Sequence, residues 1–154
     1  MAQDELLVNC RFYFEADGIT DKMILEVGGL SSESPPAGSN GVFGVSKDAA
    51  QLRQPTPTSV KTSPITVKVV ATTNTDLYQW YAACNKNMGG ASEWESNLKA
   101  CSITVYDQAG TMKARWEIQE AYPSKYEGPN LTATGNDLAN ETLTLQHIGV
   151  ERVL

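Results

Sequence analysis

The chain has 154 residues, of which 41% are hydrophobic and 19% are charged. This length is enough for one domain with a substantial buried core. Eighteen acidic residues and twelve basic ones give a net charge of −6, and no basic patch or tail stands out. The charge balance argues against a nucleic-acid-binding protein that works by neutralising phosphates, so we expect no specific nucleic-acid recognition.

The targeting and redox features are those of a cytoplasmic protein. The N-terminal sequence Met-Ala-Gln-Asp-Glu is acidic where a secretory signal is basic. No stretch reaches the roughly 20 apolar residues of a membrane span, so we expect no membrane insertion by this chain. The three cysteines Cys10, Cys84 and Cys101 have unrelated spacings, which predict neither a disulfide framework nor a zinc site.

The N-terminal segment has the alternation of β-strands. Phe12 and Phe14 lie on one face of a first strand, and Leu25 lies on the apolar face of a second. The turn signal Asp17-Gly18 separates the two strands. We expect a hairpin over residues 9–30 that places Phe12, Phe14 and Leu25 in the core.

Residues 31–64 differ in character, since they hold five of the seven prolines and many Ser, Thr and Gly residues. A structureless loop of this length is uncommon inside a compact domain and is usually functional or disordered. Val42, Phe43 and Val45 interrupt the polar sequence. We expect a protruding arm with a strand-like middle, whose small apolar spot another subunit could bury.

The middle of the chain changes from strand to helix. Residues 65–71 alternate as a strand with Val67 on the apolar face. Leu77, Trp80 and Tyr81 then recur at helical spacing, with capping residues before them and a glycine pair after residue 88. This pattern predicts one helix with Leu77, Trp80 and Tyr81 facing the core.

The remainder is predicted to be β, with strands over residues 101–106, 112–121, 126–133 and 141–150. A turn over residues 107–110 joins the first two, and Pro123 is expected to break the second. The residues expected in the core are Ile103, Trp116, Ile118, Leu143 and Leu145. The predicted fold is a mainly β, antiparallel sandwich or barrel with one packed helix and a long arm, in a single domain over residues 1–154.

Residues that could support catalysis are sparse. The single histidine, His147, has no nucleophile-elbow motif beside it. No His, Cys or Asp group has metal-ligand spacing, and no glycine-rich segment has the context of a phosphate loop. We therefore expect no enzyme activity, metal or cofactor. Trp94 lies in a polar, glycine-flanked segment and is a candidate for contact with another subunit, with local packing as the alternative.

Four blocks resemble, in the family's order, the tail-tube proteins of contractile phages and injection systems. The blocks are Asp76-Leu77-Tyr78-Gln79-Trp80-Tyr81; Ile103-Thr104-Val105-Tyr106-Asp107 with Gly110; Ala114-Arg115-Trp116 leading to Ala121-Tyr122-Pro123 and Lys125-Tyr126-Glu127-Gly128-Pro129; and Glu141-Thr142-Leu143-Thr144-Leu145-Gln146-His147 with Gly149. In addition, Arg53-Gln54-Pro55 resembles a basic-x-Pro element that precedes the family's central strand.

This resemblance implies a structural subunit that forms hexameric rings stacked into a hollow tube. The partners it implies are further copies of the chain, a contractile sheath, and baseplate, spike and tube-terminating proteins. It also implies assembly in the cytoplasm and ejection through a target envelope. The expected ring-stacking or inter-subunit residues are Val42, Phe43, Val45, Arg53 and Trp94.

Two other classes of function stay open at this stage. A monomeric β-sandwich module that binds carbohydrate could use exposed aromatic residues such as Tyr13, Tyr122 and Tyr126. A small hydrolase would have to depend on His147. The sequence leaves open the type of parent particle, its cargo and the residues that line the lumen.

Overall fold

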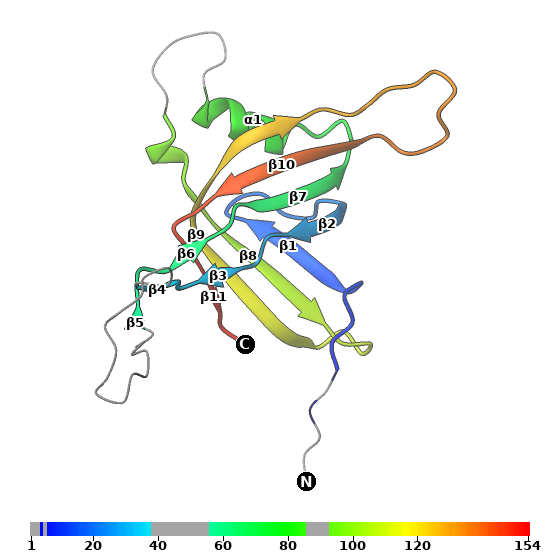
Figure 1. Ribbon diagram of the computed structural model, residues 1–154. Coiled ribbons are helices and arrows are strands. Elements are labelled where there is room, and N and C mark those ends of the chain that lie inside the picture. Colours follow the sequence, from blue (N-terminus) through cyan, green and yellow to red (C-terminus); the bar gives the residue numbers. More distant parts are fainter. Residues whose placement is uncertain (1–3, 5, 38–55, 86–92) are drawn as a thin grey trace, which may run out of the picture.

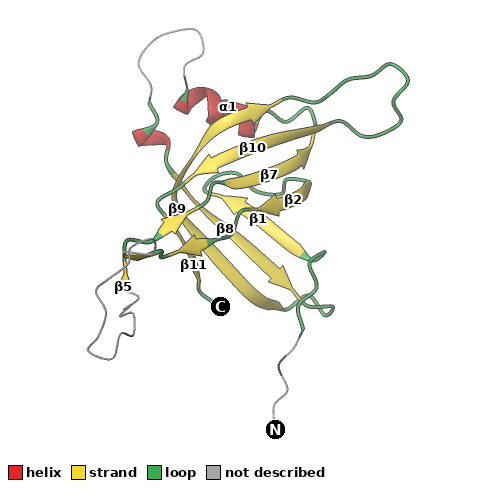
Figure 2. Cartoon of the chain, viewed as in Figure 1, coloured by secondary structure: helices red, strands yellow, loops and turns green. Residues whose placement is uncertain are grey.

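The computed structural model describes residues 4, 6–37, 56–85 and 93–154. Within these residues the chain is mainly β, with one α-helix and one short 3-10 helix, η1 (Figure 2). The elements are β1 (Phe12–Ala16), β2 (Ile24–Gly28), β3 (Ser32–Glu33), β4 (Pro36–Ala37), β5 (Thr56–Pro57), β6 (Lys61–Thr62), β7 (Ile65–Val70), α1 (Asp76–Cys84), η1 (Glu95–Asn97), β8 (Lys99–Tyr106), β9 (Met112–Glu127), β10 (Asn140–Gln146) and β11 (Gly149–Arg152).

The long strands form two antiparallel layers that share β9 (Figure 1). The first half of β9 pairs with β8 and β11, and β8 pairs with β1; we call these four strands sheet A. The second half of β9 pairs with β10, which is followed by β7 and β2; we call this sheet B. The predicted mainly β, antiparallel fold is therefore confirmed, with α1 packed against β9.

Strand β9 passes from one layer to the other without ending, so the expectation that Pro123 breaks it is wrong. Two irregularities let the strand bend. Glu120 has a φ of 49° where the pairing with β8 shifts register, and a second shift against β10 leaves Ser124 as an extra residue. The bulge at Ser124 accommodates the missing N–H of Pro123, which is buried opposite Leu145.

The expected hairpin over residues 9–30 does not form, because β1 pairs with β8 whereas β2 pairs with β7. Leu25 is also not a core residue, since half of its surface is exposed. The cause is a register shift between Ile24 and Glu26, which makes Leu25 the bulged residue. Ile24 and Val27 face the core instead, three positions apart rather than two.

The core lies between the two sheets and under α1. Eight of the residues expected there are buried: Phe14, Val67, Leu77, Trp80, Ile103, Ile118, Leu143 and Leu145. The other three, Phe12, Tyr81 and Trp116, are only half-buried. Phe12 begins β1 and Trp116 lies in the first half of β9, both in sheet A; the guanidinium carbon of Arg152 lies 5.4 Å from the centroid of the Trp116 ring.

The helix begins where its caps predict and ends earlier than expected. The Asn74 side-chain oxygen accepts a hydrogen bond from the Asp76 amide at 2.9 Å, and Lys22 forms an ion pair with Asp76 at 2.9 Å. The helix ends at Cys84, because the Asn85 side chain binds both Tyr81 O and Pro123 O. Among the described helices, none is long and apolar enough to span a membrane.

The arm leaves the barrel as a paired stem. Strand β3 pairs with β6 and β4 pairs with β5, so the two sides of the arm run antiparallel at its base. Gly29 fixes the root of this stem: its φ is 95°, and a Cβ there would lie 2.2 Å from Pro64 O. Val42, Phe43, Val45 and Arg53 lie outside the described residues.

Candidate assembly surfaces

Sheet A has two free edges. In the described part of the chain, β1 and β11 each pair with one neighbouring strand, and they are the outer strands of this sheet. Unpaired strand edges attract other strands, so proteins normally shorten, charge or cover them. Here both edges belong to the same four-stranded sheet and lie on opposite sides of it, so another copy could extend the sheet at either side.

The backbone of β11 presents donors to its free side. Val153 N donates to Arg115 O at 2.9 Å, which makes these two residues a hydrogen-bonded pair of the ladder. In an antiparallel ladder, hydrogen-bonded pairs alternate with non-bonded pairs. The N–H groups of Arg152 and Val150 therefore point away from β9, toward the open edge.

The outer face of sheet A is polar. In the cross-strand register, Glu15, Ser102, Glu117 and Glu151 form one row across all four strands. Glu117 and Glu151 lie directly opposite each other, an arrangement that destabilises a sheet. Arg115 Nε lies 3.5 Å from Glu117 Oε1 and partly compensates this charge. Such a face suits contact with water rather than a second apolar layer.

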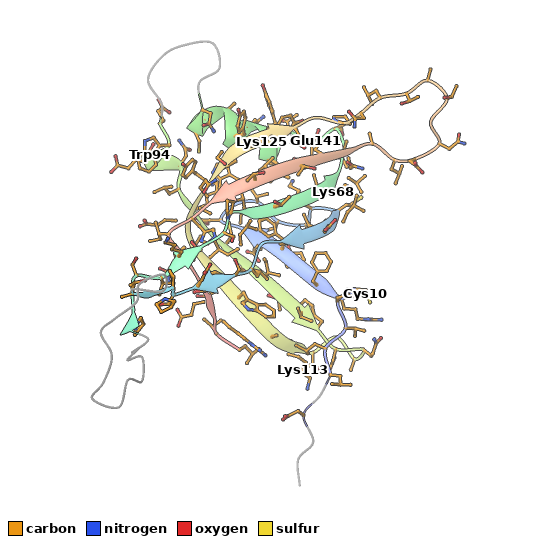
Figure 3. All side chains as sticks on the ribbon, viewed as in Figure 1. Cys10, Lys68, Trp94, Lys113, Lys125 and Glu141 are labelled. Atoms are coloured by element: carbon orange, nitrogen blue, oxygen red, sulfur yellow. The ribbon has the colours of Figure 1, made fainter. Side chains whose placement is uncertain are left out.

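Trp94, whose position is labelled in Figure 3, is 47% exposed and lines a groove. The Trp94 ring packs against Tyr122 with 5.9 Å between centroids, so the side chain has a local packing partner as well as a free surface. Leu98 and Ile148 line the same groove, whose volume is about 570 Å³. We call this the Trp94 groove; its lining also includes Glu95, Glu120, Gln146 and His147.

His147 has a structural contact. It lies between β10 and β11, and its Nε2 is 2.9 Å from Ser63 O at the base of the arm. Its Nδ1 is buried and makes no hydrogen bond. No group of three or more His, Cys, Asp or Glu side chains among the described residues could hold a metal ion.

The tyrosines considered for carbohydrate binding contact different parts of the molecule. Tyr13 accepts a hydrogen bond from the Asp21 amide at 3.0 Å, and Tyr122 packs against Trp94. Tyr126 forms an edge-to-face pair with Tyr78 at 5.1 Å. Burial, together with a hydrogen bond to Glu141, raises the pKa of Tyr126 to about 12. These contacts do not make a shared aromatic binding face.

Comparison with protein families identifies the chain. Residues 8–151 match the model of the T4-like virus tail tube protein gp19. The chain belongs to this family. It is thus a structural tube subunit of the tail-tube family, as the four sequence blocks indicated. No curated protein matches the sequence.

Solved structures share the fold. The sheath/tube terminator of PVC, an extracellular contractile injection system, has a TM-score of 0.77 and 21% identity, covering 99% of this chain and 100% of that chain. The tube-terminating cap of the anti-feeding prophage has a TM-score of 0.76 and 19% identity, covering 99% and 93%. Hcp1 from Flavobacterium johnsoniae has a TM-score of 0.59 and 14% identity, covering 93% and 94%.

Some surface features of this tube subunit were not predicted from its sequence. The glutamate row depends on strand register, which alternation alone does not reveal. The sequence predicts a strand over residues 126–133, whereas β9 ends at Glu127 and residues 128–139 form a loop that extends from the barrel (Figure 1). The Leu131 and Leu138 side chains on this loop are 80% and 76% exposed. The signal in the sequence for an exposed loop is that each leucine stands alone in a polar segment.

Proposed function

We propose that this chain is the repeating subunit of the inner tube of a contractile injection particle, and that six copies close a ring through sheet A. The observation that supports this most strongly is the combination in sheet A of two free edges and one polar face. Strand β11 of one copy would pair with β1 of the next. This pairing consumes both free edges of sheet A in the closed ring.

The strand directions favour this pairing. Each pair β1–β8, β8–β9 and β9–β11 is antiparallel, so β1 and β11 run in opposite directions. Rotation about an axis that runs along a barrel keeps the direction of each strand. A β11–β1 contact between adjacent copies is therefore antiparallel, and the alternation of sheet A continues around the ring.

The polar face of sheet A would then line the lumen. The row of Glu15, Glu117 and Glu151 would repeat in every copy and form a ring of carboxylates around the channel. Arg115 lies two residues before Glu117 on β9 and contacts it, so the face carries both signs of charge. A wall with a hydrated row of charged side chains is suited to passage of a polar cargo.

The remaining partners follow from the tube role. We propose that the outside of the tube contacts a contractile sheath, and that baseplate or spike proteins and a terminator close its two ends. Solved structures of similar fold belong to a sheath-tube complex, a terminator and a baseplate. Assembly would occur in the cytoplasm, and no catalytic step is needed for this role.

A proline at the β11 edge tests ring closure. Arg152→Pro removes an N–H that points away from β9 and so costs no backbone hydrogen bond of the β9–β11 ladder; the side-chain bond from Arg152 Nε to Leu154 O is lost in the Pro variant and in its Ala control alike. Arg152→Ala is the control, because it removes the side chain over Trp116 and keeps the N–H. We expect sedimentation velocity to show rings for the Ala variant and a shift toward the 16.7 kDa monomer for the Pro variant. Equal assembly of the two folded variants would contradict pairing through β11.

A further inference from the structure

We propose that a recess in the polar face of sheet A is a binding site for lysine side chains of a protein or peptide cargo in the lumen. The inference rests on the proposed tube function and names the chemistry of what the channel would hold. Three features of this face carry it: a hollow along β8, an unpartnered hydroxyl at the base of the hollow, and carboxylates on both of its sides.

The recess follows β8 because the outward side chains of this strand are short. Ser102 lies between Glu15 of β1 and Glu117 of β9 in the cross-strand register, and Ala100 O accepts a hydrogen bond from the Asp17 amide at 3.0 Å. Short side chains on a central strand, with longer ones on both neighbouring strands, leave a hollow over the central strand. The hollow has a volume of about 290 Å³ and is lined by residues of these three segments, which lie side by side (Figure 1). We call it the Ser102 recess.

The Ser102 side chain lies at the base of the recess without a partner. Ser102 is only 8% exposed, and it points away from the core because its neighbours Cys101 and Ile103 are core residues. In the part of the chain that the structure describes, no group forms a hydrogen bond with the Ser102 hydroxyl. Buried hydroxyl groups normally have a hydrogen-bond partner. This one is therefore available to a donor that enters the recess.

The charge around the recess is negative. Glu15 and Asp17 line it and form no ion pair with any described residue, whereas Arg115 offsets only Glu117, with 3.5 Å between Nε and Oε1. Glu151 lies opposite Glu117 on the other side of β9 and adds a further carboxylate next to the recess. This field repels a phosphate-bearing cargo and attracts a basic group.

The groups of the recess suit the ammonium group of a lysine side chain. An ammonium carries three N–H donors and one positive charge, and Glu15, Glu117 and the Ser102 hydroxyl are acceptors on three adjacent strands. Opposed Cβ atoms of adjacent strands are about 5 Å apart, so both glutamates can reach a group that lies over Ser102. The described residues contain no set of three acidic, His or Cys side chains placed as metal ligands, which disfavours a metal ion here. Every copy in a ring has the same recess, so a segment with several lysines would occupy several recesses at once.

Peptide binding to the assembled protein tests the Ser102 recess. The probe is a short fluorescent peptide with several lysines, compared by fluorescence anisotropy with the same peptide carrying glutamine at those positions. We expect the lysine peptide to bind more tightly, and Glu15→Gln to weaken its binding about fivefold. Glu26→Gln is the matched control, because it removes the same charge from an exposed strand residue of sheet B and should leave binding unchanged. Ser102→Ala alters no charge and should weaken binding at least about twofold.

The outcomes separate the two proposals. If tubes form but bind both peptides equally, or if assembled Ser102→Ala protein binds the lysine peptide as tightly as the unsubstituted protein, the recess is not a lysine site and the tube function stands. If Glu15→Gln and Glu26→Gln weaken binding equally, only the net charge of the chain attracts the peptide, and the binding proposal is also wrong. Glu15 is exposed, so this comparison decides the proposal even where Ser102→Ala does not assemble. If the protein forms no rings or tubes, the proposed function fails, and the cargo site fails with it.

Discussion

Truncation of Trp80 should strongly destabilise the subunit. This side chain is 4% exposed and lies in the core under α1. Its indole Nε1 also donates a hydrogen bond to Asn97 O at 2.9 Å, which connects the helix to η1. Trp80→Ala therefore removes a large buried ring and leaves a partly buried carbonyl without its donor.

The size of the effect follows from these two losses. Replacing a buried Phe or Trp by Ala costs about 3–5 kcal/mol. Trp80→Phe keeps most of the ring and loses mainly the hydrogen bond, so we expect about 1–2 kcal/mol. Trp116→Ala is a useful comparison. Because Trp116 is only half-buried, its truncation should lower the free energy of unfolding less than Trp80→Ala does. The free energy of unfolding of an ordinary domain is about 5–15 kcal/mol in total, so Trp80→Ala would remove a large part of it.

Urea denaturation followed by circular dichroism measures these differences. Two protein concentrations are needed, since assembly would add to the apparent stability of the folded state. The expected order of destabilisation is Trp80→Ala, then Trp116→Ala and Trp80→Phe. A Trp80→Ala midpoint equal to that of the unsubstituted protein would show that the ring does not support the core, and the position assigned to α1 would be wrong.

Three further predictions concern single sites. Gly29→Ala should cost more than about 1 kcal/mol in the same denaturation assay, because its φ is 95° and Pro64 O blocks a Cβ; Gly28→Ala, with open space around it, should change stability by less than about 0.5 kcal/mol. The raised pKa of Tyr126 means that its stabilising contribution is complete below pH 10 and falls between pH 10 and about 12. In an absorbance titration Tyr126→Phe should therefore remove a late-titrating tyrosine, and an unchanged curve would contradict this. The exposed Cys10 should react with a thiol reagent in the folded protein, whereas buried Cys101, whose pKa burial raises to about 12, should react only on unfolding.

The sequence predicted the faces of regular elements well. Residues that alternate without interruption, such as Val67 in β7 or Leu143 in β10, are buried as expected. Alternation assumes a regular strand, and this assumption fails where the backbone contains an extra residue. Leu25 is exposed because it is itself the extra residue in β2. Pro123 can lie inside β9 because the extra residue Ser124 follows it.

Pairing between strands was harder to predict than the strands themselves. A period of two shows which side chains share a face but not which strand lies alongside. The proposed hairpin of residues 9–30 therefore failed, although both of its strands exist. The free edges of sheet A and its glutamate row depend on the same long-range pairing. The family, in contrast, could be inferred from four ordered blocks, because these blocks include the helix and the shared strand β9.

The most direct test of the tube account is cryo-electron microscopy of the purified, assembled chain. The account predicts stacked six-membered rings in which β11 of each subunit pairs with β1 of the next, with Glu15, Glu117 and Glu151 facing the channel. Dispersed 16.7 kDa monomers at high concentration, or rings in which sheet A lies on the outer surface, would contradict it.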